Sequence, residues 1–212
     1  MTTPRIAVLI PVKDGPGAKS RLRAVGDTGR ADLMAAFARD AISAASQVAL
    51  ADVYVVGDAP SLRELADGLD VPVLADEGRG DLNRALRAAA RRLPPTGTGV
   101  AAMLADLPCL QPADLEDALR EALERGGRTF VADSAGTGTT LLVAAAGFEL
   151  DPRFGRGSAA AHLDSGAARM GEDLTSLRLD VDTTDDLERA LSFGVGDATR
   201  RVAAALDRQT RD

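Results

Sequence analysis

Several residue types that build common functional sites are scarce in this sequence of 212 residues. One cysteine, Cys109, and one histidine, His162, allow neither an intramolecular disulfide nor a zinc site made of cysteines and histidines. Any metal ion would therefore be held by carboxylate oxygens, which are the ligands that magnesium prefers. Without a nearby histidine in the sequence, Cys109 is interpreted as a small buried apolar residue rather than a nucleophile.

Long apolar runs and concentrated positive charge are missing as well. The longest segment without a charged residue, 134–148, has fifteen residues, fewer than the roughly 18 that cross a bilayer. The net charge is −7, the basic residues are dispersed, and aromatic residues make up 3% of the chain, which disfavours nucleic-acid binding. The N-terminal segment shows no signal-peptide pattern. We therefore expect a cytoplasmic protein that binds neither membrane nor nucleic acid.

Lysine is rare, and its position is informative. Only two of the 25 basic residues are lysines, Lys13 and Lys19, and both follow the first apolar run in a loop that contains glycines. Backbone N–H groups at glycines and flexible ammonium groups are suited to binding a polyphosphate. The loop matches neither the Rossmann fingerprint, because Ser20 stands at its third glycine, nor the P-loop, because Ala18 precedes the lysine. We predict a phosphate-binding loop; the alternative is a turn whose lysines face water.

Hydrophobic periodicity predicts alternating strands and helices, which is typical of a mostly parallel sheet covered on both faces. Strands are expected over 6–11, 53–57, 71–74, 100–105, 129–132, 139–145 and 174–181. Helices are expected over 30–49, 61–69, 82–93, 112–125 and 158–170, with a last helical region from 186 to about 208. We predict one compact α/β domain, residues 1–212, that binds ligands at the carboxyl ends of its parallel strands.

Acidic side chains follow two of the predicted strands. Asp106 comes directly after 100–105, and strand alternation places Asp180 and Asp182 on one face of the segment that ends near 181. Together the three carboxylates could hold Mg²⁺ at about 2.1 Å from each oxygen, with substrate phosphates completing the shell. The competing explanation is that Asp106 forms a turn and that one of the later pair caps a helix.

Two glycine-rich segments, 136–140 and 154–158, are candidate anion pockets. The hydroxyls of Thr140 and Ser158 and the N–H groups at a helix start near 158 could bind a phosphate or a carboxylate. Taken singly, each segment is better explained as a turn or a helix cap. His162 follows Ser158 by one helical turn, but that pair lacks the strand-to-helix elbow of a serine hydrolase.

Seven motifs, taken in order, resemble the guanylyltransferases of coenzyme F-420 biosynthesis over nearly the whole chain. The motifs are Pro-Val-Lys at 11–13, Ala-Lys-Ser-Arg-Leu at 18–22, Asp-Leu-Asn at 81–83, Asp-Leu-Pro at 106–108, Gly-Thr-Gly-Thr-Thr at 136–140, Phe-Gly-x-Gly-Ser at 154–158 with His162, and Leu-Asp-Val-Asp-Thr at 179–183. The family comprises 2-phospho-L-lactate guanylyltransferase and phosphoenolpyruvate guanylyltransferase, and it is similar in fold to the molybdenum cofactor guanylyltransferase.

The resemblance implies a three-layer, Rossmann-like nucleotidyltransferase fold (MobA-like, GT-A type) and a reaction that needs Mg²⁺. GTP and phosphoenolpyruvate would give enolpyruvyl-2-diphospho-5'-guanosine and pyrophosphate, and the product would pass to a downstream deazaflavin transferase. Arginine-rich, lysine-poor composition is typical of a high-GC bacterium. Because the resemblance is closest to the bacterial branch of the family, it implies phosphoenolpyruvate rather than 2-phospho-L-lactate. A different nucleotidyltransferase of this fold and a non-catalytic GTP-binding regulator are the competing interpretations. Either a monomer or a homodimer is compatible with the sequence.

The resemblance also assigns residue roles. The catalytic residues it implies are Lys13, Lys19 and Asp106. The nucleotide-binding residues are Lys13, Lys19, Asp81, Leu82 and Asn83, and the residues for phosphoenolpyruvate are Thr140, Gly155 and Ser158. The magnesium ligands are Asp106, Asp180 and Asp182, and the family pattern does not distinguish Asp180 from Asp182.

Overall fold

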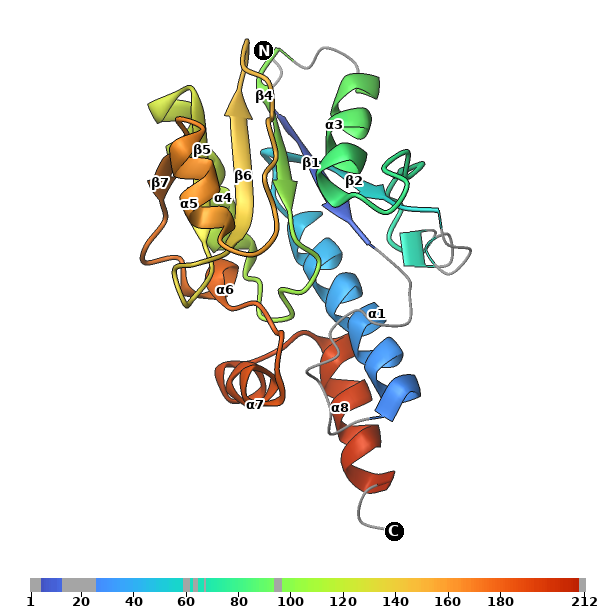
Figure 1. The fold of residues 1–212 in the computed structure, drawn as a ribbon. Coiled ribbons are helices and arrows are strands. Elements are labelled where there is room, and N and C mark those ends of the chain that lie inside the picture. The colour runs from blue at the N-terminus through green and yellow to red at the C-terminus, as the bar shows by residue number, and fades with distance from the viewer. Residues whose placement is uncertain are drawn as a thin grey trace.

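A computed structural model of the protein describes residues 5–12, 26–58, 62, 65, 66, 68–93 and 97–209. Their central feature is a seven-stranded sheet with helices on both faces (Figure 1). The strands are β1 (Ile6–Pro11), β2 (Ala51–Val56), β3 (Val73–Leu74), β4 (Gly99–Met103), β5 (Arg128–Ala132), β6 (Thr139–Ala145) and β7 (Ala168–Met170). The helices are α1 (Gly26–Ala45), α3 (Leu82–Arg92), α4 (Pro112–Arg125), α5 (Ser158–Asp164), α6 (Thr175–Arg178), α7 (Thr184–Phe193) and α8 (Asp197–Gln209). The predicted α/β class is confirmed.

The sheet is mostly parallel and has the order β3-β2-β1-β4-β6-β5-β7. Parallel pairs join β1 to β2 and β4, β2 to β3, and β5 to β7, whereas β6 runs antiparallel to both β4 and β5. The chain proceeds from β1 to β2 and β3 on one side and resumes with β4 on the other side of β1. In open α/β sheets the carboxyl ends of the strands form a ligand crevice at such a switch point.

Two apolar clusters, one on each face, hold the three layers together. The first packs α1, α4 and α6 against the sheet through buried residues such as Ile42, Leu119 and Leu177. The second packs α3 and α5 against the opposite face around Leu86, Phe130 and Ala159. Side chains of this size gain roughly 1.5–3 kcal/mol each when buried, so these clusters fix the sheet that carries the site.

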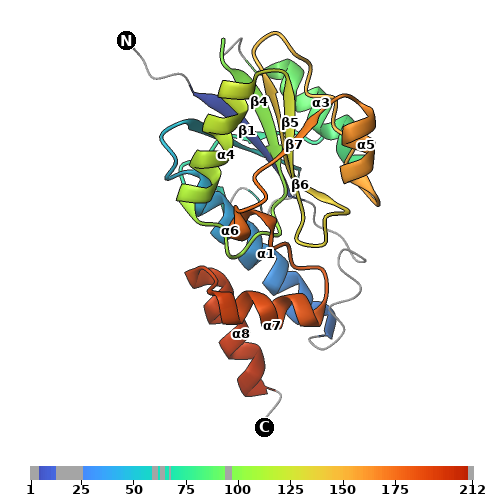
Figure 2. The ribbon, with the colours of Figure 1, turned by 90° about the vertical axis from the view of Figure 1, so that its left-hand side faces the viewer.

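A third cluster joins the last helices to the N-terminal half of α1. It includes Leu33 and Phe37 from α1, Leu187 from α7, and Leu179 and Val181 from the segment before α7. Figure 2 shows α7 and α8 packed at the end of the molecule where the carboxyl ends of the parallel strands lie. In the described part of the chain no helix has both the length and the apolar character needed to span a membrane.

The structure corrects two predicted elements near the C-terminal end. The helix expected over 158–170 ends at Asp164, because Gly166 adopts a φ of +85° and the chain then enters β7 beside β5. The strand expected over 174–181 is instead α6 followed by an irregular segment. Ser176 donates its backbone N–H and its hydroxyl to Asp114 of α4, so a tertiary contact overrides the alternating pattern.

Other boundaries differ by a few residues. The first helix occupies 26–45 rather than 30–49, and the last helical region is two helices separated by Gly194–Gly196. The prediction for 139–145 coincides with β6, and that for 112–125 with α4, which begins at Pro112 and ends before Gly126 at a φ of +66°. The helix expected over 61–69 falls partly outside the described residues.

Candidate functional site

Several strands end or begin at one edge of the sheet, on either side of the switch point. β1, β2, β4 and β5 end there, and the antiparallel β6 begins there. The backbone amide of Leu104, just after β4, donates to the carbonyl of Thr140 in β6 at 2.9 Å. Asp106 lies two residues farther along. The sequence segments proposed for metal and acceptor binding therefore emerge beside each other.

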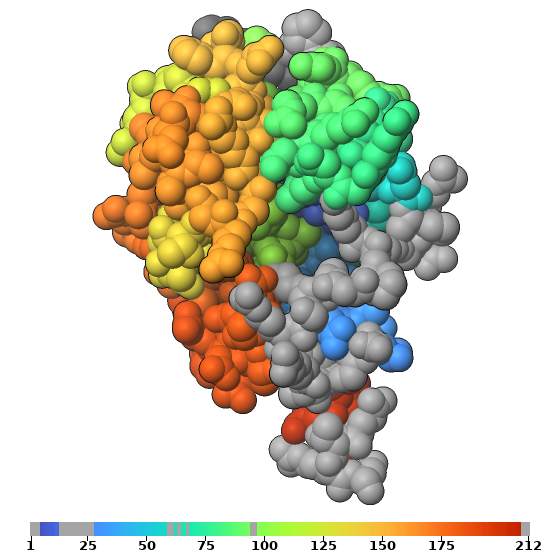
Figure 3. Space-filling view, viewed as in Figure 1, coloured from blue at the N-terminus to red at the C-terminus, as the bar shows by residue number. Residues whose placement is uncertain are grey.

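The surface at this edge is hollowed. Figure 3 shows a recess whose rim includes the green region of α3 on one side and the golden segment that follows β6 on the other. The green of the chain around β4 is visible in the floor of the recess. A small molecule could enter here and reach the ends of the central strands.

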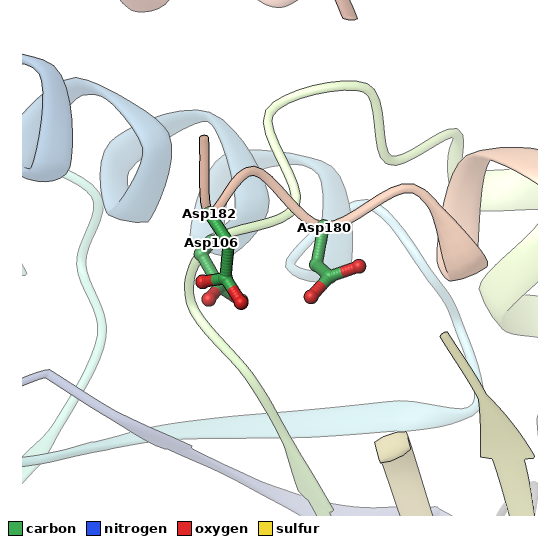
Figure 4. Close-up of side chains that lie close together, drawn as sticks. All are labelled: Asp106, Asp180 and Asp182. Carbon is green, nitrogen blue, oxygen red and sulfur yellow. The ribbon is translucent and has the colours of Figure 1, made fainter. Parts of the chain in front are cut away.

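Asp106, Asp180 and Asp182 form what we call the carboxylate cluster (Figure 4). One carboxylate oxygen from each lies within 4.8 Å of the others; Asp106 and Asp180 are half-buried, and Asp182 is exposed. Oxygens bound to the same Mg²⁺ at about 2.1 Å lie about 3 Å apart when adjacent and about 4.2 Å apart when opposite, so the three carboxylates would move closer together on binding it. The donor set consists only of carboxylate oxygens, which suits a hard divalent cation.

Backbone contacts bring the cluster together. The amide of Val181 donates to the carbonyl of Asp106 at 3.1 Å, which docks the 180–182 segment onto the end of β4. Val181 is fully buried in the third apolar cluster, so its two neighbours point the other way. The prediction that Asp180 and Asp182 share a face thus agrees with their positions, although the segment is not a strand.

The start of α7 fixes the position of Asp182. Thr183 caps this helix by accepting from the amide of Asp186 at 3.2 Å, and the Asp186 carboxylate accepts from the amide and the hydroxyl of Thr183. The same carboxylate accepts from the amide of Asp182 at 3.3 Å. Because Thr183 and Asp186 perform the capping, Asp182 is not itself the helix cap.

The lysine predictions lie outside the described residues. After β1 the described residues include Val12, whose amide donates to the carbonyl of Val56 at 3.0 Å. Lys13 lies outside them. Lys19 is likewise outside. Their assignment to the triphosphate and to catalysis stays a prediction.

Of the three residues assigned to phosphoenolpyruvate, Gly155 and Ser158 lie at the start of α5, whereas Thr140 lies in β6. Gly155 is exposed with a φ of +136°, and its carbonyl accepts from the amide of Ser158 at 3.1 Å. Ser158 is 2% exposed, and Thr140 is fully buried with its hydroxyl 3.4 Å from the carbonyl of Val131. A backbone bond from Ala159 to Thr137 joins the two glycine-rich segments. Only Gly155 of the three presents an open surface.

The residues assigned to the nucleotide begin α3, and two of them have structural partners. Asp81 caps the helix, with its carboxylate accepting from the amide of Arg84 at 3.0 Å. Leu82 packs against the second apolar cluster. The side-chain amide of Asn83 bonds to the backbone of Phe154, the residue just before Gly155.

His162 is buried and neutral. Its Nε2 accepts from the backbone amide of Arg153 at 2.9 Å, which places the ring proton on Nδ1, 2.9 Å from the hydroxyl oxygen of Thr139. Burial, assisted by the charge of Arg153, lowers its pKa to about 4. His162 therefore connects β6 to the segment before Gly155 and is not a general base.

Cys109 is also excluded as a nucleophile. Burial, with a contribution from the charge of Asp40, raises the pKa of its thiol to about 12. Its sulfur lies 3.5 Å from the carbonyl of Ala190 in α7. The interpretation of Cys109 as a buried apolar residue is confirmed.

Two arginines near the site were missed in the sequence, where nothing distinguishes them from the other surface cations. Arg87 donates to the carbonyl of Pro152 at 3.2 Å. Arg178 donates to the carbonyls of Ala132 and Asp133, each at 3.2 Å, and so ties the chain before Asp180 to the end of β5.

Comparisons with known proteins agree with this geometry. A family model described as "Guanylyl transferase CofC like" matches residues 6–207. Phosphoenolpyruvate guanylyltransferases of Streptomyces avermitilis and Streptomyces coelicolor are 47% and 48% identical over 205 residues. These alignments cover 94% of this chain and 94% and 96% of the two relatives, respectively.

Solved structures share the fold at lower identity. A protein of Desulfovibrio desulfuricans G20, provisionally assigned as a nucleotide-diphospho-sugar transferase, has a TM-score of 0.67 at 20% identity and covers 96% of each chain. The protein Rv0371c of Mycobacterium tuberculosis H37Rv, in complex with manganese, has a TM-score of 0.52 at 24% identity, with 90% of this chain and 100% of that chain covered. The nucleotidyltransferase-type fold predicted from the sequence is confirmed.

Proposed function

The chain belongs to the CofC-like guanylyl transferase family, and we propose that it joins GTP to phosphoenolpyruvate, releasing pyrophosphate and forming enolpyruvyl-2-diphospho-5'-guanosine. The two Streptomyces relatives bear the name of that activity and match almost the whole chain. The carboxylate cluster at the switch point is the structural observation that carries the proposal. A downstream deazaflavin transferase would receive the product.

Charge is the main obstacle to this reaction. The phosphate of one substrate must approach the α-phosphate of the other, and both are anions. Catalysis then consists mainly of positioning and neutralising these groups, and no general base is needed because the attacking phosphate is already ionised. This fits a site in which the only histidine is buried, with its pKa lowered to about 4.

Asp106, Asp180 and Asp182 would hold Mg²⁺, which supplies positive charge to the phosphate oxygens when it is bound. One oxygen of each lies within 4.8 Å of the others, which supports including all three in the ligand set. The M. tuberculosis neighbour binds manganese, an ion with similar oxygen ligands. Asp106, anchored by Val181, would set the position of that charge.

The remaining residues divide between the two substrates, one on each side of the recess. Lys13 and Lys19 would contact the triphosphate as flexible cations, and Asp81 and Leu82 would lie on the nucleotide side. Gly155 and the N-terminal end of α5, with Ser158 and Thr140, would hold the acceptor phosphate or carboxylate. We call residues 155–158 the acceptor turn.

The test is pyrophosphate release by the full chain. With GTP, phosphoenolpyruvate and Mg²⁺ we expect steady release, and none when the acid is omitted. A competition between phosphoenolpyruvate and 2-phospho-L-lactate at equal concentration should favour the former. Preference for phospholactate would reassign the acceptor, and GTP binding without release with either acid would contradict the proposed activity.

A further inference from the structure

Asn83 forms a two-bond pair with the backbone of Phe154, which lies 71 positions away in the sequence. Its Oδ1 accepts from the amide of Phe154 at 2.7 Å, and its Nδ2 donates to the carbonyl of the same residue at 2.9 Å. A side-chain amide matches a peptide N–H and C=O in this way, as a neighbouring strand would. Asn83 thereby links α3 to the chain just before the acceptor turn.

Two further side chains bind the same stretch. His162 accepts from the amide of Arg153, and Arg87 donates to the carbonyl of Pro152. The ring of Phe154 packs edge-on against that of His162, with centroids 5.3 Å apart. Side chains from α3 and α5 thus hold residues 152–154 from both sides, and Phe154 is 8% exposed.

The chain immediately beyond this anchored stretch is different. Gly155 and Gly157 have φ values of +136° and +72°, and residues 155–157 are exposed. Glycines reach these conformations at little cost but also leave them easily, so the turn by itself has no fixed shape. Its geometry therefore depends on the anchored residues before it and on α5 after it.

We propose that Asn83 is a positioning residue that fixes the acceptor turn, rather than a group that contacts the guanine base. The inference rests on the proposed function, because it assumes that the acceptor acid binds at residues 155–158. Both ends of the Asn83 amide already bond Phe154 in good geometry. A contact with the base would have to compete with these bonds, whereas positioning uses them as they are.

The experiment separates the two substrates kinetically. Asn83→Leu removes both bonds while keeping the number and branching of the side-chain heavy atoms. Asn83→Asp keeps the acceptor for the Phe154 amide but places a carboxylate against the Phe154 carbonyl. We expect the KM for phosphoenolpyruvate to rise about tenfold in Asn83→Leu, while the KM and the dissociation constant for GTP stay within twofold. Asn83→Asp should give a smaller rise and covers the case in which the leucine variant folds poorly.

Gln47→Leu is the control, because it also replaces a side-chain amide with leucine, at an exposed residue whose amide bonds to Ser43 alone among the described residues. Hydrogen exchange provides a second readout. In Asn83→Leu the amide of Phe154 should exchange at least tenfold faster, and the Arg153 amide, bound by His162, should change less. Gln47→Leu should leave both amides and both KM values unchanged.

Two results would overturn the inference. A rise in the KM for GTP with an unchanged acceptor KM would show that Asn83 contacts the nucleotide. If the unmodified chain is active and Asn83→Leu has the same kinetics as Gln47→Leu, the pair of Asn83 and Phe154 is only a structural contact. Failure of the proposed function has another signature, since the unmodified chain would then release no pyrophosphate with either acid.

Discussion

The carboxylate cluster and the acceptor turn lie at the same edge of the sheet but are held by different kinds of contact. A backbone bond between Val181 and Asp106 and the cap of α7 position the carboxylates. Side chains, chiefly Asn83 and His162, position the acceptor turn. A site docked by a backbone bond and supported by one helix cap should be less sensitive to single side-chain changes than a site held by a few individual side chains.

Asp106→Asn should have the largest effect and tests the cluster directly. Removing one ligand charge while keeping the shape should lower kcat by about a thousandfold or more, as loss of metal-assisted charge stabilisation does. The backbone bond to Val181 does not involve the side chain, so the fold should persist. Pyrophosphate release and a thermal melt measure the two effects.

The thermal melt tests a second consequence of Asp106→Asn, its effect on stability. Without metal, Asp106→Asn should melt close to the temperature of the unmodified chain, because the bond that docks the 180–182 segment uses the backbone of Asp106. Asp185→Asn, a charge change of equal size at an exposed position, is the control. Full activity in Asp106→Asn would rule out its role as a ligand, and a collapse in stability would show that the cluster is not backbone-held.

On the side of the acceptor turn, stability should depend on pH through His162. Burial lowers its pKa to about 4 in the folded chain, against an ordinary value of 6.5, so the unfolded chain binds more protons between these values. The free energy of unfolding should therefore fall as the pH drops from about 6.5 to 4, by up to about 1.4 kcal/mol per pH unit and about 3 kcal/mol in all.

His162→Gln isolates this effect from the carboxylates that also titrate below pH 5. In urea unfolding at pH 7, 5.5 and 4, the stability difference between the unmodified chain and the variant should shrink as the pH falls. A difference that stays constant over this range would mean that His162 has an ordinary pKa in the folded chain and does not accept from Arg153.

Asp186→Ala should have the smallest effect and tests the cap that supports Asp182. Loss of the capping box is expected to cost about 1 kcal/mol of stability. Because the Asp186 carboxylate also accepts from the amide of Asp182, the Mg²⁺ concentration for half-maximal activity should rise a fewfold. The KM for phosphoenolpyruvate should not move at saturating metal. An acceptor KM that rises in proportion would show that the two regions are not held independently.

The contrast between the regions also explains what the sequence could predict. Strand ends are recognisable from apolar runs, and the carboxyl ends of parallel strands meet at one edge, so Asp106 could be placed at this edge from sequence alone. Asp180 and Asp182 were predicted beside it, but from a strand that the structure does not contain. The segment that carries the last two was assigned the wrong secondary structure, because Asp114 of α4 captures Ser176 and no local pattern reports that contact.

The side chains that hold the acceptor turn could not be identified from the sequence in this way. Asn83 was assigned to the nucleotide because the resemblance to the guanylyltransferases implied that role for its Asp-Leu-Asn motif. Its partner, Phe154, belongs to a segment 71 positions later, and the pairing follows only from how α3 and α5 pack on the same face of the sheet. His162 was noticed as a lone histidine, but its bonds to Thr139 and Arg153 could be recognised only in three dimensions.

The bond between Val181 and Asp106 has a consequence for how a bound ion acts on the fold. β5, β6 and β7 lie between these two residues in the chain, so one ligand precedes that part of the sheet and the other two follow it. The set is complete only when both parts of the chain are folded together. A bound divalent ion should therefore stabilise the whole fold rather than one part of it.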